Sequence, residues 1–157
     1  MTTPSPVVSN ASPLIALEQI GHLDLLERLF ASLLVPPAVI RETAPTVTLP
    51  AWISERPLTQ FIGPQILRAS LGPGESEALS LALEVNARWV LLDERPARRL
   101  AQTLGLPVIG TLGILLASKR RGFLSEIRPC IDALVSFGFR ITPDLYDRVL
   151  TDAGENS

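Results

Sequence analysis

Short continuous apolar runs and longer stretches with helical spacing alternate along the chain. The apolar runs predict buried strands over 6–9, 89–93 and 108–109, and a similar run at 33–35 ends at Pro36-Pro37. The stretches with helical spacing predict helices over 13–20, 23–32, 72–85, 95–104 and 111–121, another through Val39 and Glu42, and two more in 125–151, separated at Gly138. Because helices separate successive strands, the pattern predicts an α/β fold with a parallel sheet covered on both faces.

Residues 44–72 do not follow this pattern, since they are rich in Pro and Thr and show no clear periodicity. We expect Trp52, Phe61 and Ile62 to anchor this stretch to the core. The sequence shows no internal repeat and no low-complexity linker. We therefore expect a single domain over 1–157, with an α/β core at about 6–123 and C-terminal helices in 125–151.

Composition indicates a folded cytoplasmic protein. The chain is 46% hydrophobic and only 19% charged, which argues against disorder. No apolar run reaches the length that spans a membrane, and the first residues do not resemble a signal peptide. The single cysteine, Cys130, lies in an apolar stretch and fits a reducing compartment, so we interpret it as a packing residue.

Charge is distributed unevenly along the chain, although the net charge is only −2. Residues 88–128 contain eight cations and three acids, and 13 of the 14 cations in the whole chain are arginines. Arginine is well suited to bidentate contact with phosphate, which favours a nucleic-acid partner. A biased base composition of the genome would produce the same excess of arginine, so both interpretations stay open.

Several common kinds of active site are excluded by the motifs. The chain has no GxGxxG after a strand and no GxxxxGK[ST], so the usual nucleotide-binding loops are missing. Its one histidine, His22, falls in a predicted turn between two helices and leaves a serine or cysteine triad without a well-placed base. One histidine and one cysteine also make a zinc site implausible.

The remaining candidates are oxygen-bearing side chains at the ends of elements. Asn10 follows the first strand and Asp93 closes the strand 89–93, so both are expected at the carboxyl edge of the sheet, where ligands bind. Glu42 lies on the helix after Pro37, and Glu75 and Glu77 begin the helix 72–85.

Each candidate also has a purely structural interpretation. Acids in a first helical turn complement the helix dipole, and Asp93 could cap the helix that begins near Pro96. Ser12, followed by Pro13, is the predicted N-cap of the first helix. If the carboxylates cluster in one cleft, however, their like charges disfavour ionisation. A bound Mg²⁺ or Mn²⁺ would offset this electrostatic repulsion. Such an ion could also activate a water molecule to attack a phosphodiester.

An ordered series of segments resembles the PIN domain family over nearly the whole chain. The segments are SNASPLIALEQIGHLDLLERLF, LLVPPAVIRE, GPGESEALSLALEVNARWVLLDERPARRLAQTLGLPVIGTLGILL and RITPDLYDRVL. The resemblance implies a three-layer α/β/α domain and a Mg²⁺- or Mn²⁺-dependent ribonuclease. Similarity to VapC-like toxins further implies RNA, a small antitoxin and a second copy of the chain as partners.

Carried over to this sequence, the family's acidic positions fall on Asn10, Glu42, Glu77 and Asp93, with Glu94 and Glu75 as alternates. Thr111 and Ser12 are expected to support the site through their hydroxyl groups. The cations expected to hold the RNA backbone are Arg95, Arg98, Arg99, Lys119 and Arg120.

Asn10 departs from the aspartate that the family usually has at this position. An amide oxygen can still bind a cation but contributes no negative charge, a difference worth several kcal/mol at an effective dielectric constant of about 20. Two hypotheses follow, an active ribonuclease and a catalytically weakened module that binds RNA or protein. A nucleotide-binding or phospho-acceptor domain is a weaker alternative, because only Asp93 supports it.

Overall fold

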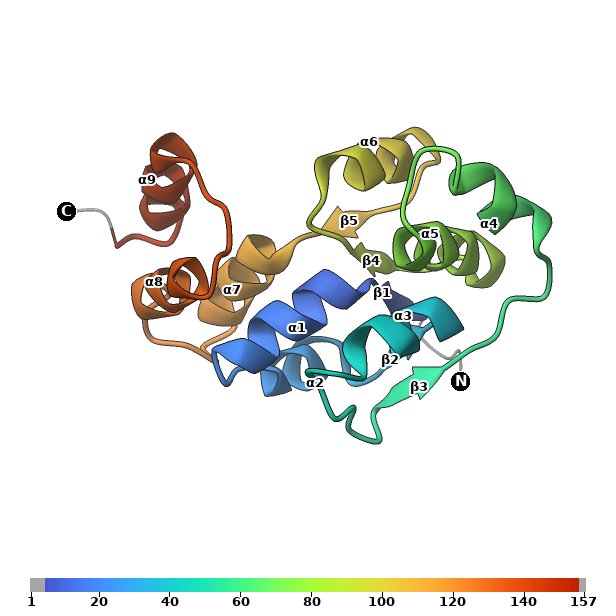
Figure 1. Ribbon diagram of the computed structural model, residues 1–157. Coiled ribbons are helices and arrows are strands. Elements are labelled where there is room, and N and C mark those ends of the chain that lie inside the picture. The colour runs from blue at the N-terminus through green and yellow to red at the C-terminus, as the bar shows by residue number, and fades with distance from the viewer. Residues whose placement is uncertain (1–4, 156–157) are drawn as a thin grey trace.

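The fold is built on a five-stranded sheet in which every strand is parallel to its neighbours, in the order β3-β2-β1-β4-β5. The computed structural model describes residues 5–155. The strands are β1 (Val7–Ser9), β2 (Leu33–Val35), β3 (Ile53–Glu55), β4 (Trp89–Leu91) and β5 (Val108–Ile109), labelled in Figure 1. The predicted α/β class with a parallel sheet is confirmed.

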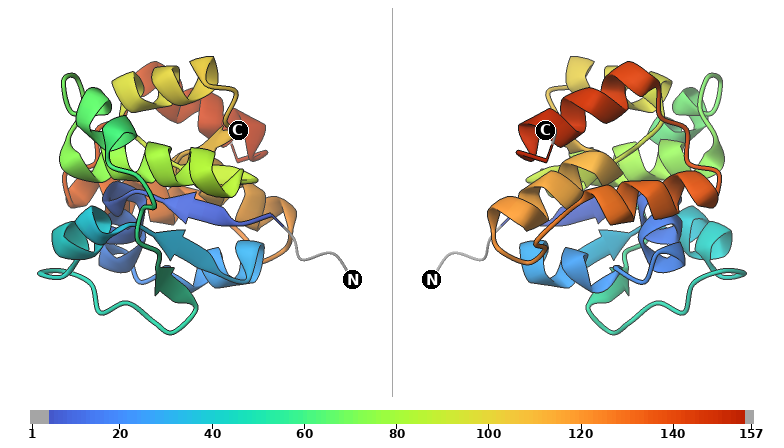
Figure 2. Two further views of the ribbon diagram at one scale, coloured as in Figure 1. Left: turned by 90° about the vertical axis from the view of Figure 1, so that its right-hand side faces the viewer. Right: turned by 90° about the vertical axis from the view of Figure 1, so that its left-hand side faces the viewer.

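Helices cover both faces of this sheet (Figures 1 and 2). They are α1 (Ala11–Gln19), α2 (Asp24–Phe30), α3 (Pro37–Thr43), α4 (Ile62–Leu67), α5 (Pro73–Val85), α6 (Arg95–Thr103), α7 (Thr111–Arg120), α8 (Arg128–Ser136) and α9 (Pro143–Asp152). Val7 packs with α1, α2, α7 and α8, whereas Val8 packs with α5 and α6, as the alternation of side chains along a strand requires. No helix within residues 5–155 is long and apolar enough to cross a membrane.

The order of the strands creates a crevice between the ends of β1 and β4. After β1 the chain proceeds to β2 and β3 on one side, and it later returns to place β4 and β5 on the other. Ser9 is paired with Leu91, and the Asn10 amide donates to the Leu91 carbonyl at 3.0 Å. Such a reversal of strand order is where open parallel sheets bind ligands, and Asn10 lies at its edge.

The start of the first helix differs from the prediction. Helix α1 begins at Ala11, and Asn10 is its N-cap, with extended backbone angles of φ −81° and ψ 172°. Ser12 therefore lies in the first turn and is not the cap, while Pro13 is tolerated there because an N–H at this position would have no partner within the helix. The Asn10 side chain makes no capping hydrogen bond, which leaves it available to the crevice.

The irregular stretch 44–72 contains an edge strand and a short helix that the sequence did not predict. In β3 only Ile53 is buried, and the exposed residues that follow it leave no apolar run to recognise. Trp52 packs against the core as expected. The prediction for Phe61 and Ile62 is wrong, since they are 76% and 71% exposed. Helix α4 instead buries Pro64.

Glu155 joins the C-terminal helices to the rest of the domain. Its carboxylate accepts hydrogen bonds from the amides of Ile127 (2.7 Å) and Arg128 (3.0 Å) and from Lys119 Nζ (2.9 Å). The side chain is only 8% exposed. Burial by itself would raise the pKa of Glu155, but these hydrogen bonds outweigh it, so the pKa lies below its ordinary value.

Replacing Glu155 by Gln is expected to lower the free energy of unfolding by about 2 kcal/mol, because charge-assisted hydrogen bonds are lost. Since the folded-state pKa is depressed, this contribution is complete above the unfolded pKa of about 4.3 and is lost as the pH falls through the folded value. Urea unfolding from pH 7 to pH 3 should therefore show a weaker acid destabilisation in Glu155→Gln than in the wild type. Equal pH dependence in Glu155→Gln and in the exposed control Glu126→Gln would contradict this role.

Candidate active site

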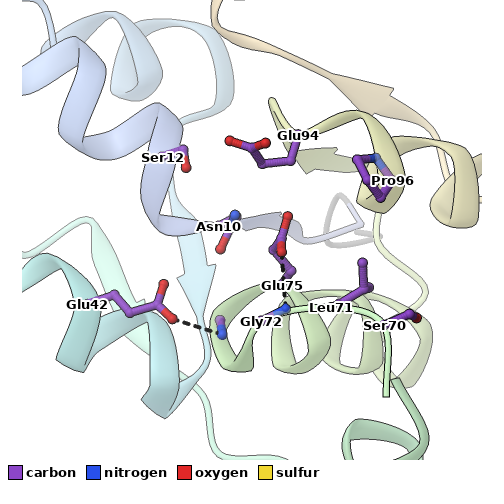
Figure 3. Close-up of a pocket in the computed structure, with 10 residues that line it drawn as sticks. Asn10, Ser12, Glu42, Ser70, Leu71, Gly72, Glu75, Glu94 and Pro96 are labelled. Atoms are coloured by element: carbon purple, nitrogen blue, oxygen red, sulfur yellow. Dashed lines mark hydrogen bonds between the residues drawn. The ribbon is translucent and has the colours of Figure 1, made fainter. Parts of the chain in front are cut away.

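A cavity of about 320 Å³ opens beyond the carboxyl ends of β1 and β4. Six polar side chains line it: Asn10, Ser12, Glu42, Ser70, Glu75 and Glu94. In Figure 3 the three glutamates approach Asn10 from α3, from α5 and from the start of α6. Oxygen-bearing groups that are distant in the sequence therefore meet at the reversal of strand order.

Asn10 is the most buried polar residue of this cavity, with 3% exposure. Its Oδ1 atom is buried and has no hydrogen-bond partner among residues 5–155. An unsatisfied buried acceptor costs about 1–3 kcal/mol, so it needs an explanation. Coordination of a cation by this oxygen is one explanation, because amide oxygens coordinate hard divalent ions.

Three carboxylates share the cavity with Asn10. Glu42 accepts a hydrogen bond from the Gly74 amide at 3.0 Å, and Glu75 accepts one from the Gly72 amide at 3.3 Å. Glu94 occupies the N-cap position of α6 without a capping hydrogen bond from its side chain. In the described part of the chain no basic nitrogen lies within 4.0 Å of any of them, since the ion pairs found involve other acids.

The electrostatic cost of this grouping appears at Glu75. The pKa of Glu75 lies above its ordinary value, and burial is the largest cause. The hydrogen bond from the Gly72 amide lowers the pKa, and the negative charges of Glu94 and Glu42 raise it. The surroundings of Glu75 therefore disfavour its ionised form. A bound cation would reverse that penalty.

The charge of Glu75 should consequently reduce stability in the absence of metal. A raised folded-state pKa means that stability is fully present below the unfolded pKa and declines as the pH rises through the folded value. We expect Glu75→Gln to raise the melting temperature in EDTA at pH 7 by about 1–2 °C, a small change because the group is half-exposed and screened. Thermal unfolding in EDTA measures this, and a lower melting temperature in the variant would contradict it.

Glu77 and Asp93, which the resemblance favoured as ligands, do not line this cavity. Glu77 Oε1 accepts a hydrogen bond from the Ala38 amide at 2.9 Å, at the start of α3, and its Oε2 lies 4.0 Å from Arg41. Asp93 accepts hydrogen bonds from the amide of Thr111 at 2.8 Å and from its hydroxyl at 2.7 Å. Both carboxylates thus satisfy helix N-termini, and their roles as ligands stay predictions.

Ser12 and Thr111, the predicted supporting residues, occupy different positions. Ser12 lines the cavity from the first turn of α1. Thr111 instead holds Asp93 at the start of α7. A side chain at Gly110 would collide with this arrangement, since its Cβ would lie 2.5 Å from Arg98 Nη1 and 2.9 Å from Asp93 Oδ1.

The five predicted RNA-binding cations are also divided by the structure. Arg95 and Arg98 line a second, larger groove that adjoins the cavity. Arg99 and Arg120 are exposed and line neither space, and Lys119 is engaged with Glu155. The RNA-binding roles of all five stay predictions, and Arg95 and Arg98 are the members of this set that line a space next to the cavity.

Gly74 is a site residue that the sequence pattern did not single out. A Cβ atom there would overlap the carboxylate of Glu42, so only glycine lets that acid lie against the start of α5. The feature of the sequence that could have indicated it is GPGE, in which glycines stand on both sides of the proline before Glu75.

The donor set fits a hard divalent cation in its chemistry, because every available group is an oxygen. Among residues 5–155, no three His, Cys, Asp or Glu side chains are close enough as they stand to hold an ion. Glu94 is exposed and makes no capping hydrogen bond with its side chain, so its carboxylate is not tied to the start of α6, whereas Glu42 is held by the Gly74 amide. The residues that would hold the ion are Asn10, Glu42, Glu75 and Glu94.

Comparison with known protein families gives a match over nearly the whole chain. Residues 6–155 match the model of the family DUF3368, described as a PIN domain. The match begins just before β1 and includes α8 and α9. No curated protein and no solved structure matches the chain.

Proposed function

Because the chain belongs to the PIN domain family, whose members are typically nucleases that bind Mg²⁺ or Mn²⁺, we propose that it is a metal-dependent endoribonuclease. The observation that carries this proposal is the meeting of Asn10, Glu42, Glu75 and Glu94 in one cavity at the reversal of strand order. Three carboxylates and a neutral amide oxygen without a basic partner suit a hard divalent cation.

A divalent ion bound there would supply a water activated for in-line attack on a phosphodiester. The chain's own groups define its place. The amides of Gly74 and Gly72 hold Glu42 and Glu75 at the cavity wall, and Asn10 Oδ1 supplies a fixed neutral oxygen. Ser12 and the N-terminus of α1 offer a hydroxyl and unpaired amides, which suit a phosphate oxygen.

The direct test is cleavage of end-labelled single-stranded RNA by the purified chain. We expect cleavage in Mn²⁺ or Mg²⁺, none in EDTA, and recovery when metal is added back. Cleavage that persists unchanged in EDTA would contradict a metal-dependent mechanism.

A second candidate function is an RNA- or protein-binding module without turnover. Asn10 favours it, because the neutral amide removes one charge from the metal ligands that the family usually provides. RNA binding without any Mn²⁺-dependent cleavage would support this alternative over the nuclease.

We further propose that the chain acts as the toxin of a toxin–antitoxin module, since it resembles VapC-like proteins. A short neighbouring gene for a DNA-binding antitoxin, whose product co-purifies with this chain, would support that role. Homodimer formation is a separate proposal, which light scattering on the purified chain tests.

A further inference from the structure

The larger groove lies between helix α6 and the C-terminal segment that contains α9. It has a volume of about 1360 Å³. Arg95 and Arg98 line it from α6, and Arg140 and Arg148 line it from the loop before α9 and from α9 itself. Figure 1 shows α6 and α9 apart from each other, with α7 below and between them in that view.

The four arginines of this groove have no ion-pair partner. Within residues 5–155 no carboxylate lies within 4.0 Å of their guanidinium groups. The acids that line the groove are Asp93, which is engaged by Thr111, and Glu94 at the junction with the cavity. Four arginines against two acids leave an excess of positive charge on the walls, although Arg98 also donates a hydrogen bond to the Leu92 carbonyl at 2.9 Å.

Between these charged walls the groove is apolar. Phe139 lines it together with Ile109, Leu112, Leu116, Ile141 and Leu145. Arginine walls suit phosphates, and an aromatic ring on an apolar floor suits the faces of unpaired bases. A duplex would keep its base faces stacked inside, so this combination matches a single strand.

The groove is continuous with the acidic cavity. Ser12, Glu94 and Pro96 line both spaces. A strand lying along the arginines would thus reach the carboxylates directly, where the proposed cleavage occurs.

We propose that this groove binds single-stranded RNA, with Arg140 and Arg148 of the C-terminal segment forming one wall and Arg95 and Arg98 the other. Phosphates contact the arginines and bases stack on Phe139. The choice of RNA rests on the proposed ribonuclease function. The C-terminal helices then have a substrate-binding role, since they provide half of the binding surface.

The test measures binding without turnover, by fluorescence anisotropy of a labelled 12-nucleotide single-stranded RNA in EDTA. Arg140→Glu/Arg148→Glu should bind about tenfold more weakly at low salt, and the slope of log affinity against log salt should fall by about 0.7 for each arginine. The control Arg68→Glu/Arg88→Glu changes the net charge equally at exposed positions outside the groove, and its affinity should stay within about twofold of the wild type.

Two further variants keep the test decisive. Arg140→Gln/Arg148→Gln introduces no acids, so it replaces the glutamate double variant if charge reversal disturbs folding. It should bind the RNA about threefold more weakly than the wild type does. Phe139→Leu preserves an apolar side chain but removes the aromatic face, so affinity should fall several-fold with an unchanged salt slope.

Equal affinity in the groove and control double variants would overturn the proposal, as would a wild-type protein that binds no RNA, and the groove would then suit a protein partner better. Weakened binding confined to the groove variants supports it even where the wild type does not cleave. The anisotropy assay contains no metal and measures binding alone. Its result therefore tests RNA binding by the groove separately from the proposed nuclease activity.

Discussion

Glu94→Gln is expected to lower the rate of Mn²⁺-dependent RNA cleavage about 100-fold or more. The substitution keeps the shape of the side chain but removes one of three negative charges facing the cavity, a loss of a few kcal/mol at an effective dielectric constant of about 20. Glu94 makes no capping hydrogen bond with its side chain, so the fold should be unaffected. Initial cleavage rates on labelled RNA, with melting temperatures measured in parallel, provide the test.

Two further variants serve as a control and a comparison for this experiment. Glu18→Gln removes an exposed acid from α1, away from the cavity, and should cleave at the wild-type rate. Asp93→Asn should mainly lower stability, by about 1 kcal/mol, because it disturbs the hydrogen bonds to Thr111. Loss of cleavage in Asp93→Asn with normal cleavage in Glu94→Gln would reverse the assignment of the ligands.

Asn10→Asp should tighten Mn²⁺ binding by about 10- to 100-fold. It adds a charge at a position that is 3% exposed and whose amide oxygen is buried without a hydrogen-bond partner among the described residues. Without metal the same charge lies buried beside three carboxylates, so the melting temperature in EDTA should fall. Thermal unfolding with and without Mn²⁺ should therefore show a wider gap in Asn10→Asp than in the wild type.

Asn10→Ser provides the neutral comparison for this variant, since it removes the amide without adding charge. An equal Mn²⁺-induced stabilisation in wild type and Asn10→Asp would remove Asn10 from the ligand set. Cleavage that appears only in Asn10→Asp would instead favour the binding-module function for the natural sequence.

The fold was largely predictable because its signal is local. Continuous apolar runs at β1, β4 and β5 are separated by stretches of helical periodicity, and that order alone indicates a parallel sheet. Strand β3 escaped prediction because an edge strand buries few side chains, in this case Ile53 alone. Its pairing with β2 is a tertiary contact that the local pattern does not contain.

The candidate site was predictable as a place but not as a complete residue set. Asn10 could be placed because a strand leads directly into a helix there. Glu75 and Glu77 are about 200° apart around α5, so only one faces the cavity, and the rotation of the helix depends on packing. Asp93 and Glu94 are consecutive beyond β4, and the structure directs one to Thr111 and the other to the cavity.

The cationic groove shows the same limit. Arg95 and Arg98 were found because they lie in the arginine-rich part of the sequence next to Asp93. Arg140 and Arg148 lie in a segment where periodicity predicts only helices, and the packing of α9 brings them to the groove. Periodicity assigns residues to a helix, but it does not say which helices face one another.

The most direct measurement is a calorimetric titration of Mn²⁺ into the wild type, Glu94→Gln and Asp93→Asn under identical conditions. A metal site formed by Asn10, Glu42, Glu75 and Glu94 predicts saturable binding to the wild type, weakened about tenfold or more in Glu94→Gln and kept within about threefold in Asp93→Asn. The opposite order of affinities, or no binding to the wild type, would contradict a metal site in this cavity.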